Sequence, residues 1–367
     1  MAIGWGQEKL AKAINDRCLG FGLTELPIPS RKAEISRWEN GKVIPDPPMR
    51  AILREIYGRT NDDLGLPTEA DPQDASGSEL SERLIIARRV DAETIAMFRN
   101  EVDGVRHSDR RFGAAKRLEQ LRGHITDIEG QLRHTLLRRE RAPLASVLTE
   151  ASTLAGWTSL DIGALGQAWT HYERAKSAAL ESGSLALLAH ATAEQAFVLV
   201  DMGNTSDALA LFAEAREIGE RAPRLLRAWL AAAAGEGYAI AGQPGDALRS
   251  FDEADALRPS EVVHPELPFL FLGGSHLDRW RGNALVHLGA AEAIDQLESL
   301  LDGMQPSFVR ARAATLVDLA LAYAAAGDRE AAQTYANQAR RIISQVGSVR
   351  LRRRLERLVL PGNSRSA

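Results

Sequence analysis

Apolar residues recur at intervals of three and four along most of the chain, a spacing that predicts helices rather than strands. The first predicted helix runs from Gln7 to Asn15, with Leu10, Ala11 and Ile14 on its inward face. Another runs from about Met49 to Tyr57 and begins after a Pro-Pro pair, as helices often do. The amino-terminal 66 residues therefore form a small helical unit.

The segment Ser30–Pro47 contains the helix between these two. Ile35 and Trp38 stand three residues apart, so they share the face that packs inward. The polar residues fall on the other faces. Asn40-Gly41 suits a left-handed helix end, and Pro45 blocks any continuation. The pattern predicts a short helix that presents polar side chains to a partner.

The second half of the chain repeats a pattern of small residues every 38 to 47 residues. Its clearest origins are Gly163, Gly203, Gly242 and Gly327. Alanine stands five and twelve residues after each origin, and glycine or alanine stands seven residues before it. Nine residues after the origins stand Tyr172, Phe212, Phe251 and Ala336. A fifth copy at Gly289 is degenerate, because Ile294, Glu298 and Leu301 occupy these offsets. Small residues at fixed offsets let two antiparallel helices pack closely, so the pattern predicts stacked helix pairs.

Composition excludes several classes of protein. The net charge of −4 over 367 residues does not favour bulk binding of a polyanion. The single cysteine, Cys18, excludes an internal disulfide framework and indicates a reducing cytoplasm. No stretch of about 18 uninterrupted apolar residues is present, so we expect no membrane contact. The histidines lack companions at metal-ligand spacing, and the sequence has no nucleophile elbow or phosphate loop. We therefore expect no metal, no cofactor and no enzyme activity.

The repeat offsets resemble those of the tetratricopeptide repeat, over residues 143–360. The resemblance implies an α-solenoid whose concave groove is lined by the first helix of each pair. On that mapping, the groove candidates are His190, Glu194, Asp201, Trp229, Glu236, His276, Arg279, Asn283, His287 and Asp318. Each is also compatible with an ordinary surface or interhelical contact. Together their acidic, basic and aromatic character suits a peptide, small-molecule or protein ligand.

The amino-terminal unit also resembles a known family. Gln7-Glu8-Lys9-Leu10-Ala11, followed by Glu34-Ile35-Ser36-Arg37-Trp38-Glu39-Asn40-Gly41-Lys42, is similar to two helices of the lambda-repressor/Cro helix-turn-helix type, the XRE family. Its combination with a repeat array resembles regulators common in actinobacteria. The resemblance implies that residues 31–39 enter the major groove of double-stranded DNA. The implied DNA-binding residues are Gln7, Arg31, Lys32, Glu34, Ser36, Arg37, Asn40 and Lys42.

Two features depart from that family. A further helix should precede Gln7, but the six residues MAIGWG are too few to form it. Domain 1–66 is expected to be all-α, and either the start codon has been assigned too late or the domain is truncated and lacks its first helix. The interval from Asp16 to Ser30 is about fifteen residues, longer than the usual turn, and is expected to be a surface insertion.

Two segments separate the helix-turn-helix domain from the array. Residues 67–79, rich in Pro, Asp, Ser and Gly, are predicted to be a flexible linker. Residues 80–142 are predicted to be a helical connector dense in arginine: Arg88, Arg89, Arg106, Arg110, Arg111, Arg117 and Arg122. These arginines form either a solvated helical face or a contact with DNA phosphate. At the other end, SVRLRRRLERL is predicted to be a basic capping helix with Val349, Leu351, Leu355 and Leu358 inward.

The sequence thus predicts a cytoplasmic, sequence-specific DNA-binding transcriptional regulator. Its all-α repeat array would bind an effector, form a homodimer, or do both. The alternative is a tetratricopeptide interaction scaffold whose helix-turn-helix no longer binds DNA. Neither hypothesis includes catalysis.

Overall fold

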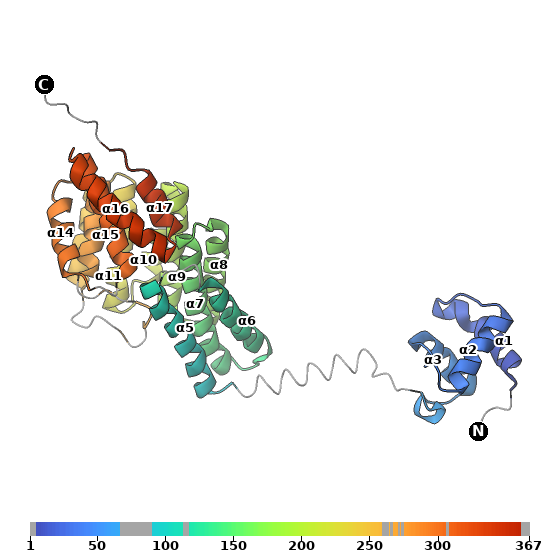
Figure 1. The fold of residues 1–367 in the computed structure, drawn as a ribbon. Coiled ribbons are helices and arrows are strands. Elements are labelled where there is room, and N and C mark those ends of the chain that lie inside the picture. The colour runs from blue at the N-terminus through green and yellow to red at the C-terminus, as the bar shows by residue number, and fades with distance from the viewer. Residues whose placement is uncertain are drawn as a thin grey trace. The chain divides into compact units, whose positions relative to one another are not determined.

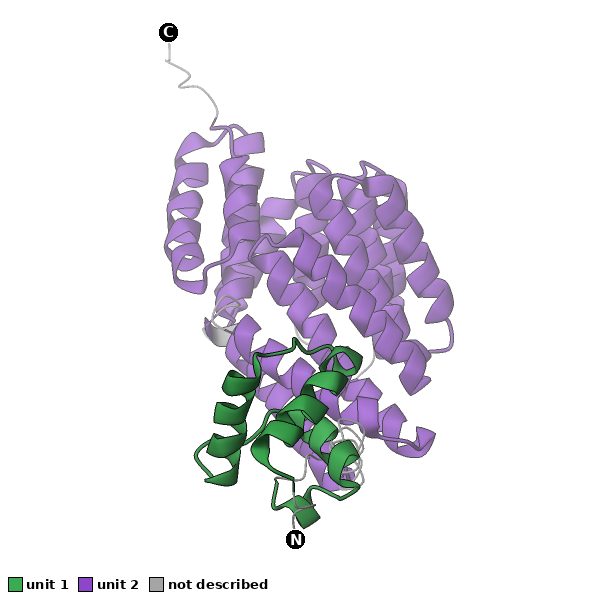
Figure 2. Ribbon diagram, turned by 90° about the vertical axis from the view of Figure 1, so that its right-hand side faces the viewer, with its two compact units in different colours: residues 1–82 green, residues 83–367 purple. Residues whose placement is uncertain are grey.

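The computed structural model describes residues 5–66, 90–112, 117–258, 264, 267–270, 272, 275–305 and 308–360. Regular structure within these ranges is helical, which confirms the predicted all-α class. The chain forms two compact units, residues 1–82 and 83–367, coloured separately in Figure 2. The predicted linker 67–79 lies outside the described residues.

The described residues of unit 1, 5–66, contain three α-helices: α1 (Gln7–Cys18), α2 (Ile28–Glu39) and α3 (Pro47–Tyr57), with 3-10 turns at Leu19–Phe21 and Asp62–Leu64. Ile14, Ile35 and Ile52, one from each helix, are fully buried against one another. The interval between α1 and α2 is residues 19–27, shorter than expected. The reason is that α1 extends to Cys18, a buried apolar anchor, and α2 begins at Ile28.

The end of α2 matches its sequence signal. Gly41 adopts a left-handed conformation with φ of 64°. The Asn40 amide donates a hydrogen bond to the Ser36 carbonyl oxygen over 2.6 Å. Asp46 then begins α3, since its carboxylate accepts from the Met49 backbone N–H at 3.0 Å.

Unit 2 is a stack of antiparallel helix pairs that lie side by side (Figure 1). Its helices are α5 (Ala92–Phe112), α6 (Leu118–His134), α7 (Arg138–Asp161), α8 (Leu165–Ser182), α9 (Leu185–Met202), α10 (Thr205–Ile218), α11 (Arg224–Ile240), α12 (Pro244–Leu257), α13 (His276–His287), α14 (Ala293–Gly303), α15 (Val309–Ala325), α16 (Arg329–Val346) and α17 (Val349–Glu356).

The predicted repeat offsets account for the packing within each pair. All five origin glycines adopt positive φ, between 69° and 86°, at the turn between the two helices of a pair. In each clear copy that has an aromatic residue nine positions after the origin glycine, its ring packs on the small residue seven positions before that glycine. A Cβ on Gly156 would lie 2.7 Å from the Tyr172 ring, and one on Gly235 would lie 2.8 Å from the Phe251 ring. The repeat architecture predicted from the sequence is therefore confirmed.

The degenerate copy at Gly289 is a complete pair, α13 with α14, in a shifted register. The buried residues of α14 are Ala293, Leu297 and Leu301, so the large residue stands eight positions after the glycine instead of nine. A Cβ on Gly282 would lie 2.6 Å from Leu297. Leu297 therefore occupies the place that an aromatic ring has in the other copies.

The described part of the predicted connector 80–142, residues 90–112 and 117–142, belongs to the array and is not a separate segment. Helices α5 and α6 pack on α7 and share a continuous core with it, in which Val102, Leu121 and Leu144 are buried. Of the named arginines, Arg106 is buried, which corrects its assignment to a solvated face, and Arg122 pairs with Glu119. Arg117 is half-buried. Arg88, Arg89 and the side chains of Arg110 and Arg111 lie outside the described residues.

The basic helix α17 lies against α7, α15 and α16 instead of only capping the end of the array. Leu351 and Leu355 are buried, as predicted, and Val349 and Leu358 are half-buried. Helix α5 meanwhile packs on α15. Both contacts bring the beginning and the end of the array together, so unit 2 is closed on itself.

Among the described residues, one helix, α9, is long and apolar enough to cross a membrane by length and composition alone. In this fold α9 packs against α7, α8, α10 and α11. Of the 18 residues Leu185–Met202 that make up the helix, 56% are buried. Its apolar residues are thus accounted for as core contacts of the array.

The close approach of Gly156 to Tyr172 makes a testable prediction. In Gly156→Ala the new methyl group meets the ring of a fully buried tyrosine, so the free energy of unfolding of unit 2 should fall by about 1–2 kcal/mol. Gly130→Ala is the control, because that exposed glycine on α6 has no neighbouring atom within 4 Å of the point where a Cβ would lie. The free energy of unfolding of Gly130→Ala should rise by up to about 1 kcal/mol, because alanine has a higher helix propensity than glycine. Urea unfolding measures both, and equal shifts would contradict the packing account.

Candidate functional site

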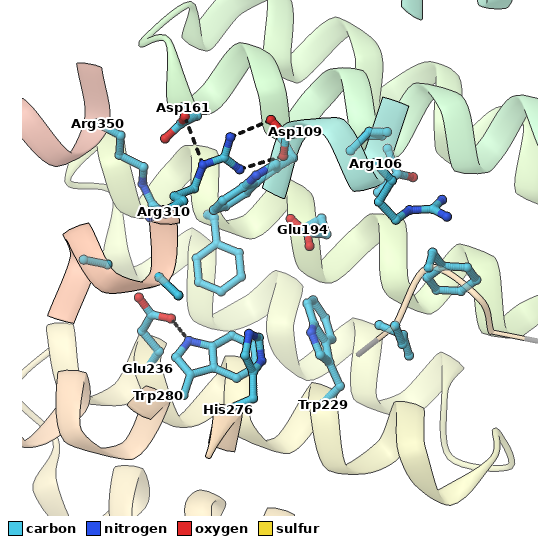
Figure 3. Close-up of a pocket in the computed structure, with 18 of the residues that line it drawn as sticks. Arg106, Asp109, Asp161, Glu194, Trp229, Glu236, His276, Trp280, Arg310 and Arg350 are labelled. Atoms are coloured by element: carbon cyan, nitrogen blue, oxygen red, sulfur yellow. Dashed lines mark hydrogen bonds and ion pairs between the residues drawn. The ribbon is translucent and has the colours of Figure 1, made fainter. Parts of the chain in front are cut away.

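A cavity of about 330 Å³ lies inside the closed array (Figure 3). Most of its wall comes from the first helices of the pairs, α7, α9, α11, α13 and α15. Helices α5 and α17, the segment before α13 and Phe308 before α15 supply the rest. The described second helices, α6, α8, α10, α12, α14 and α16, contribute no residue to the lining.

Seven of the predicted groove residues line this cavity: His190, Glu194, Trp229, Glu236, His276, Arg279 and Asn283. The other three do not. Asp201 lies behind the wall, where it pairs with Arg350, and Asp318 is fully buried under Asn283 and Arg354. His287, at the end of α13, is exposed. That the seven bind a ligand remains a prediction.

Helical spacing explains how the lining residues meet. On α13, His276, Arg279 and Asn283 stand three and four residues apart and so occupy one face. On α9, His190 and Glu194 are likewise one turn apart, with 3.6 Å between Nε2 and Oε1.

Aromatic rings form one wall of the cavity. His190 stands 4.7 Å from Trp229 and 4.6 Å from Phe269, measured between ring centroids. Trp229 is 5.6 Å from Trp280, whose indole N–H donates to the carboxylate of Glu236. These spacings are typical of favourable tilted ring contacts. The wall thus offers an apolar surface of tilted rings beside charged groups.

Ion pairs join the two ends of the array at the opposite wall. The Arg310 guanidinium donates to both carboxylate oxygens of Asp109, at 2.8 and 2.5 Å, and its Nε lies 3.5 Å from Asp161 (Figure 3). The Ser348 hydroxyl donates to Asp161 at 2.6 Å. Asp109 and Arg310 are 201 positions apart in the sequence. The cavity is therefore enclosed by contacts that only the closed array can make.

Burial controls protonation at the aromatic wall. Desolvation, assisted by the charge of Arg106, lowers the pKa of His190 to about 3, so this ring is neutral at pH 7. Desolvation raises the pKa of Glu194 to about 7, despite a hydrogen bond from the Tyr172 hydroxyl. The nearby carboxylate of Glu236 adds to the rise. Glu194 can therefore change charge near neutral pH.

Sequence reasoning missed several lining residues. They are Arg106 and Asp109 on α5, Phe269 before α13, Arg310 on α15, and Arg350 and Arg354 on α17. The last two stand one turn apart on an amphipathic helix. That spacing could have indicated a shared polar face, although nothing local reveals what the face meets.

In unit 1, the structure corrects the placement of Arg31. Its side chain is 4% exposed and is not free to meet DNA. The guanidinium donates to Glu34 at 2.7 Å, to the Asn15 side chain at 3.1 Å and to the Thr24 carbonyl oxygen at 3.4 Å. Arg31 therefore ties α2 to α1 and to the intervening loop.

The other candidates in unit 1 differ in exposure. Arg37, Asn40 and Lys42 are exposed, and Lys32 and Ser36 are half-buried. The Gln7 amide donates to Glu39 at 2.7 Å, and the half-buried Glu34 is engaged by Arg31. The polar face of α2 thus retains Arg37, Lys32 and Ser36, with Lys42 just beyond the helix end.

Comparisons with known proteins point to other helical-repeat structures. No protein-family model and no curated protein matches the chain. A Rap protein complexed with Competence and Sporulation Factor is 12% identical, with 93% of this chain and 99% of that chain covered and a TM-score of 0.46. Aspartyl phosphate phosphatase F from Bacillus subtilis is 12% identical, with coverages of 95% and 98% and a TM-score of 0.43. A putative kinesin light chain of Podospora anserina with tetratricopeptide-like repeats is 20% identical, with coverages of 55% and 97% and a TM-score of 0.36. At these values the similarities say nothing about what this chain binds.

The raised pKa of Glu194 predicts a pH effect on stability. Between pH 4.5, its ordinary pKa, and about 7, the folded chain keeps a proton that the unfolded chain has released, so the free energy of unfolding falls as pH rises. Glu194→Gln removes this loss. The free energy of unfolding of the variant, relative to that of wild type, should therefore rise by about 3 kcal/mol between pH 4 and pH 8.

Glu298→Gln is the control of opposite sign. Hydrogen bonds from Tyr323 and Tyr335, each 2.7 Å, lower the pKa of Glu298. Its ionised form therefore adds stability above the ordinary carboxyl pKa, and the variant should lose stability relative to wild type as pH rises. Thermal unfolding over this range measures both differences. A pH-independent difference for Glu194→Gln would contradict the desolvated site.

Proposed function

We propose that this chain is a ligand-responsive, sequence-specific DNA-binding regulator that acts in the cytoplasm. The observation that carries the proposal is the cavity, which joins charged groups to an aromatic wall at a volume suited to a small ligand. Such a lining suits recognition of a peptide or small molecule. We assign it a binding role rather than catalysis.

The DNA-binding part of the proposal is supported by α2. Ile35 and half-buried Trp38 anchor the helix, whereas Arg37 is exposed. A short anchored helix with exposed donors is suited to the major groove. Ten Lys and Arg against nine Asp and Glu in residues 1–66 give a charge of about +1, so a single unit should bind weakly. A homodimer, with two units on a palindrome, would offset this weakness.

The cavity also supports a response to ligand. Its wall includes α5 and α7 from the beginning of the array and α15 and α17 from its end. A ligand that contacts both ends changes the free energy of the closed state relative to any opened state. Such a ligand could therefore alter the pairing of two DNA-binding units.

A scaffold without DNA binding is the second candidate. It is favoured by the internal engagement of Gln7, Arg31 and Glu34, which removes three of the expected DNA contacts from the polar face. In that case the array would bind a protein or peptide, and α2 would only stabilise unit 1.

Arg37→Ala tests the regulator. In mobility-shift assays with DNA upstream of the protein's own gene, the variant should lose about tenfold or more in affinity for the specific site, and less for random DNA. Arg37 is exposed, so unit 1 should stay folded. Equal losses on both DNAs would restrict Arg37 to a phosphate contact.

Lys12→Ala is the matched control, since it removes one exposed positive charge from α1. It should leave the specific affinity within about twofold of wild type. The absence of any shift with the wild-type protein at low salt would reject the regulator in favour of the scaffold.

A further inference from the structure

Arg279 differs from the other arginines of the cavity. Arg106, Arg310, Arg350 and Arg354 each pair with a carboxylate. Within the part of the chain that the structure describes, the side chain of Arg279 makes no ion pair and no hydrogen bond, although its backbone N–H donates to the Ser275 carbonyl oxygen at 2.9 Å. Its Nε is shielded from solvent and unsatisfied. The cavity therefore contains one guanidinium whose charge is not directly matched.

The acidic groups nearest to Arg279 already have partners. Asp318 accepts from the Asn283 amide at 3.0 Å and from Arg354, and Glu236 accepts from the Trp280 indole. Both carboxylates attract the charge of Arg279 electrostatically without a direct contact, and desolvation by burial lowers the pKa of this guanidinium. A guanidinium has five N–H donors in a planar fork that matches a carboxylate.

An unpaired cation in a partly desolvated site is costly, because it has lost water without gaining an anion. Such a cost is typical of a site whose missing partner arrives with a ligand. The aromatic wall belongs to the same cavity, since Arg279, Trp229 and Trp280 all line it and the two tryptophan rings are 5.6 Å apart. One ligand could therefore place an anion on Arg279 and an apolar group on the rings.

We propose that the cavity binds a small organic carboxylate that carries an aromatic or other apolar group, with its carboxylate paired to Arg279 and its apolar group against Trp229 and Trp280. This assignment rests on the proposed ligand-binding function and names the ligand class. The cavity volume of about 330 Å³ limits the ligand to a small molecule or a very short peptide.

The remaining carboxyl groups of the aromatic wall are compatible with an anion. The pKa of Glu194 is about 7, so this carboxyl is largely neutral in mildly acidic solution. The charge of Glu236 is stabilised by the Trp280 N–H.

The direct test uses N-acetylated dipeptides that end in tryptophan, phenylalanine or leucine, each as the free acid and as the carboxamide. Isothermal titration with the full chain should detect binding of at least one free acid, and about tenfold weaker binding of its amide. Arg279→Met should reduce binding of that acid to the level of the amide. Equal binding of acid and amide, or no binding of any probe, would overturn the assignment.

A stability measurement separates a ligand contact from a structural role. Removing an unmatched charge should raise the midpoint of urea unfolding, so Arg279→Met should be more stable than wild type without ligand. Arg354→Met is the control, because that guanidinium pairs with fully buried Asp318 and its loss should lower the midpoint. A midpoint lowered equally in both variants would make Arg279 structural and contradict the proposal.

The two proposals fail in different ways. Loss of acid selectivity with intact DNA binding would reject the carboxylate and leave the regulator standing. Acid-selective binding without any DNA shift would confirm the ligand class and reject the regulator.

Discussion

The ion pair between Arg310 and Asp109 is the contact on which the rest of unit 2 depends. It links α15 to α5 across 201 positions, and Asp161 extends it to α7. These carboxylates are almost fully buried, with side chains 5% and 2% exposed. Buried ion pairs add little net stability over apolar contacts, but the loss of one partner costs roughly 3–5 kcal/mol. The interaction therefore specifies one closed arrangement of the array more than it strengthens the fold.

Closure explains the chemistry of the cavity. Helices that would line an open groove instead surround a small volume, and the side chains on them lose water. Desolvation is the leading cause of the low pKa of His190, the raised pKa of Glu194 and the lowered pKa of Arg279. The volume of about 330 Å³ also limits what can bind inside the cavity, because it has room for a small ligand.

Residue types at fixed spacing predicted the local packing well. The contact between Gly156 and Tyr172 joins residues 16 positions apart, so it depends only on the two helices of one pair. The closing contacts could not be predicted, because they depend on the summed rotation of every pair between α5 and α17. Arg31 was misplaced for a related reason: the loop at Thr24 folds beneath it, and a helical wheel contains no information about loops.

Hydrogen–deuterium exchange on the full chain tests the central claim that Arg310 holds the array closed around the cavity. In Arg310→Met, amides of α5 should exchange faster than in wild type, together with those of α15 and α17, because the partner at Asp109 is lost. Helices α1 to α3 of unit 1 provide the internal reference and should be unchanged. Faster exchange confined to α15, with α5 protected as in wild type, would contradict the account.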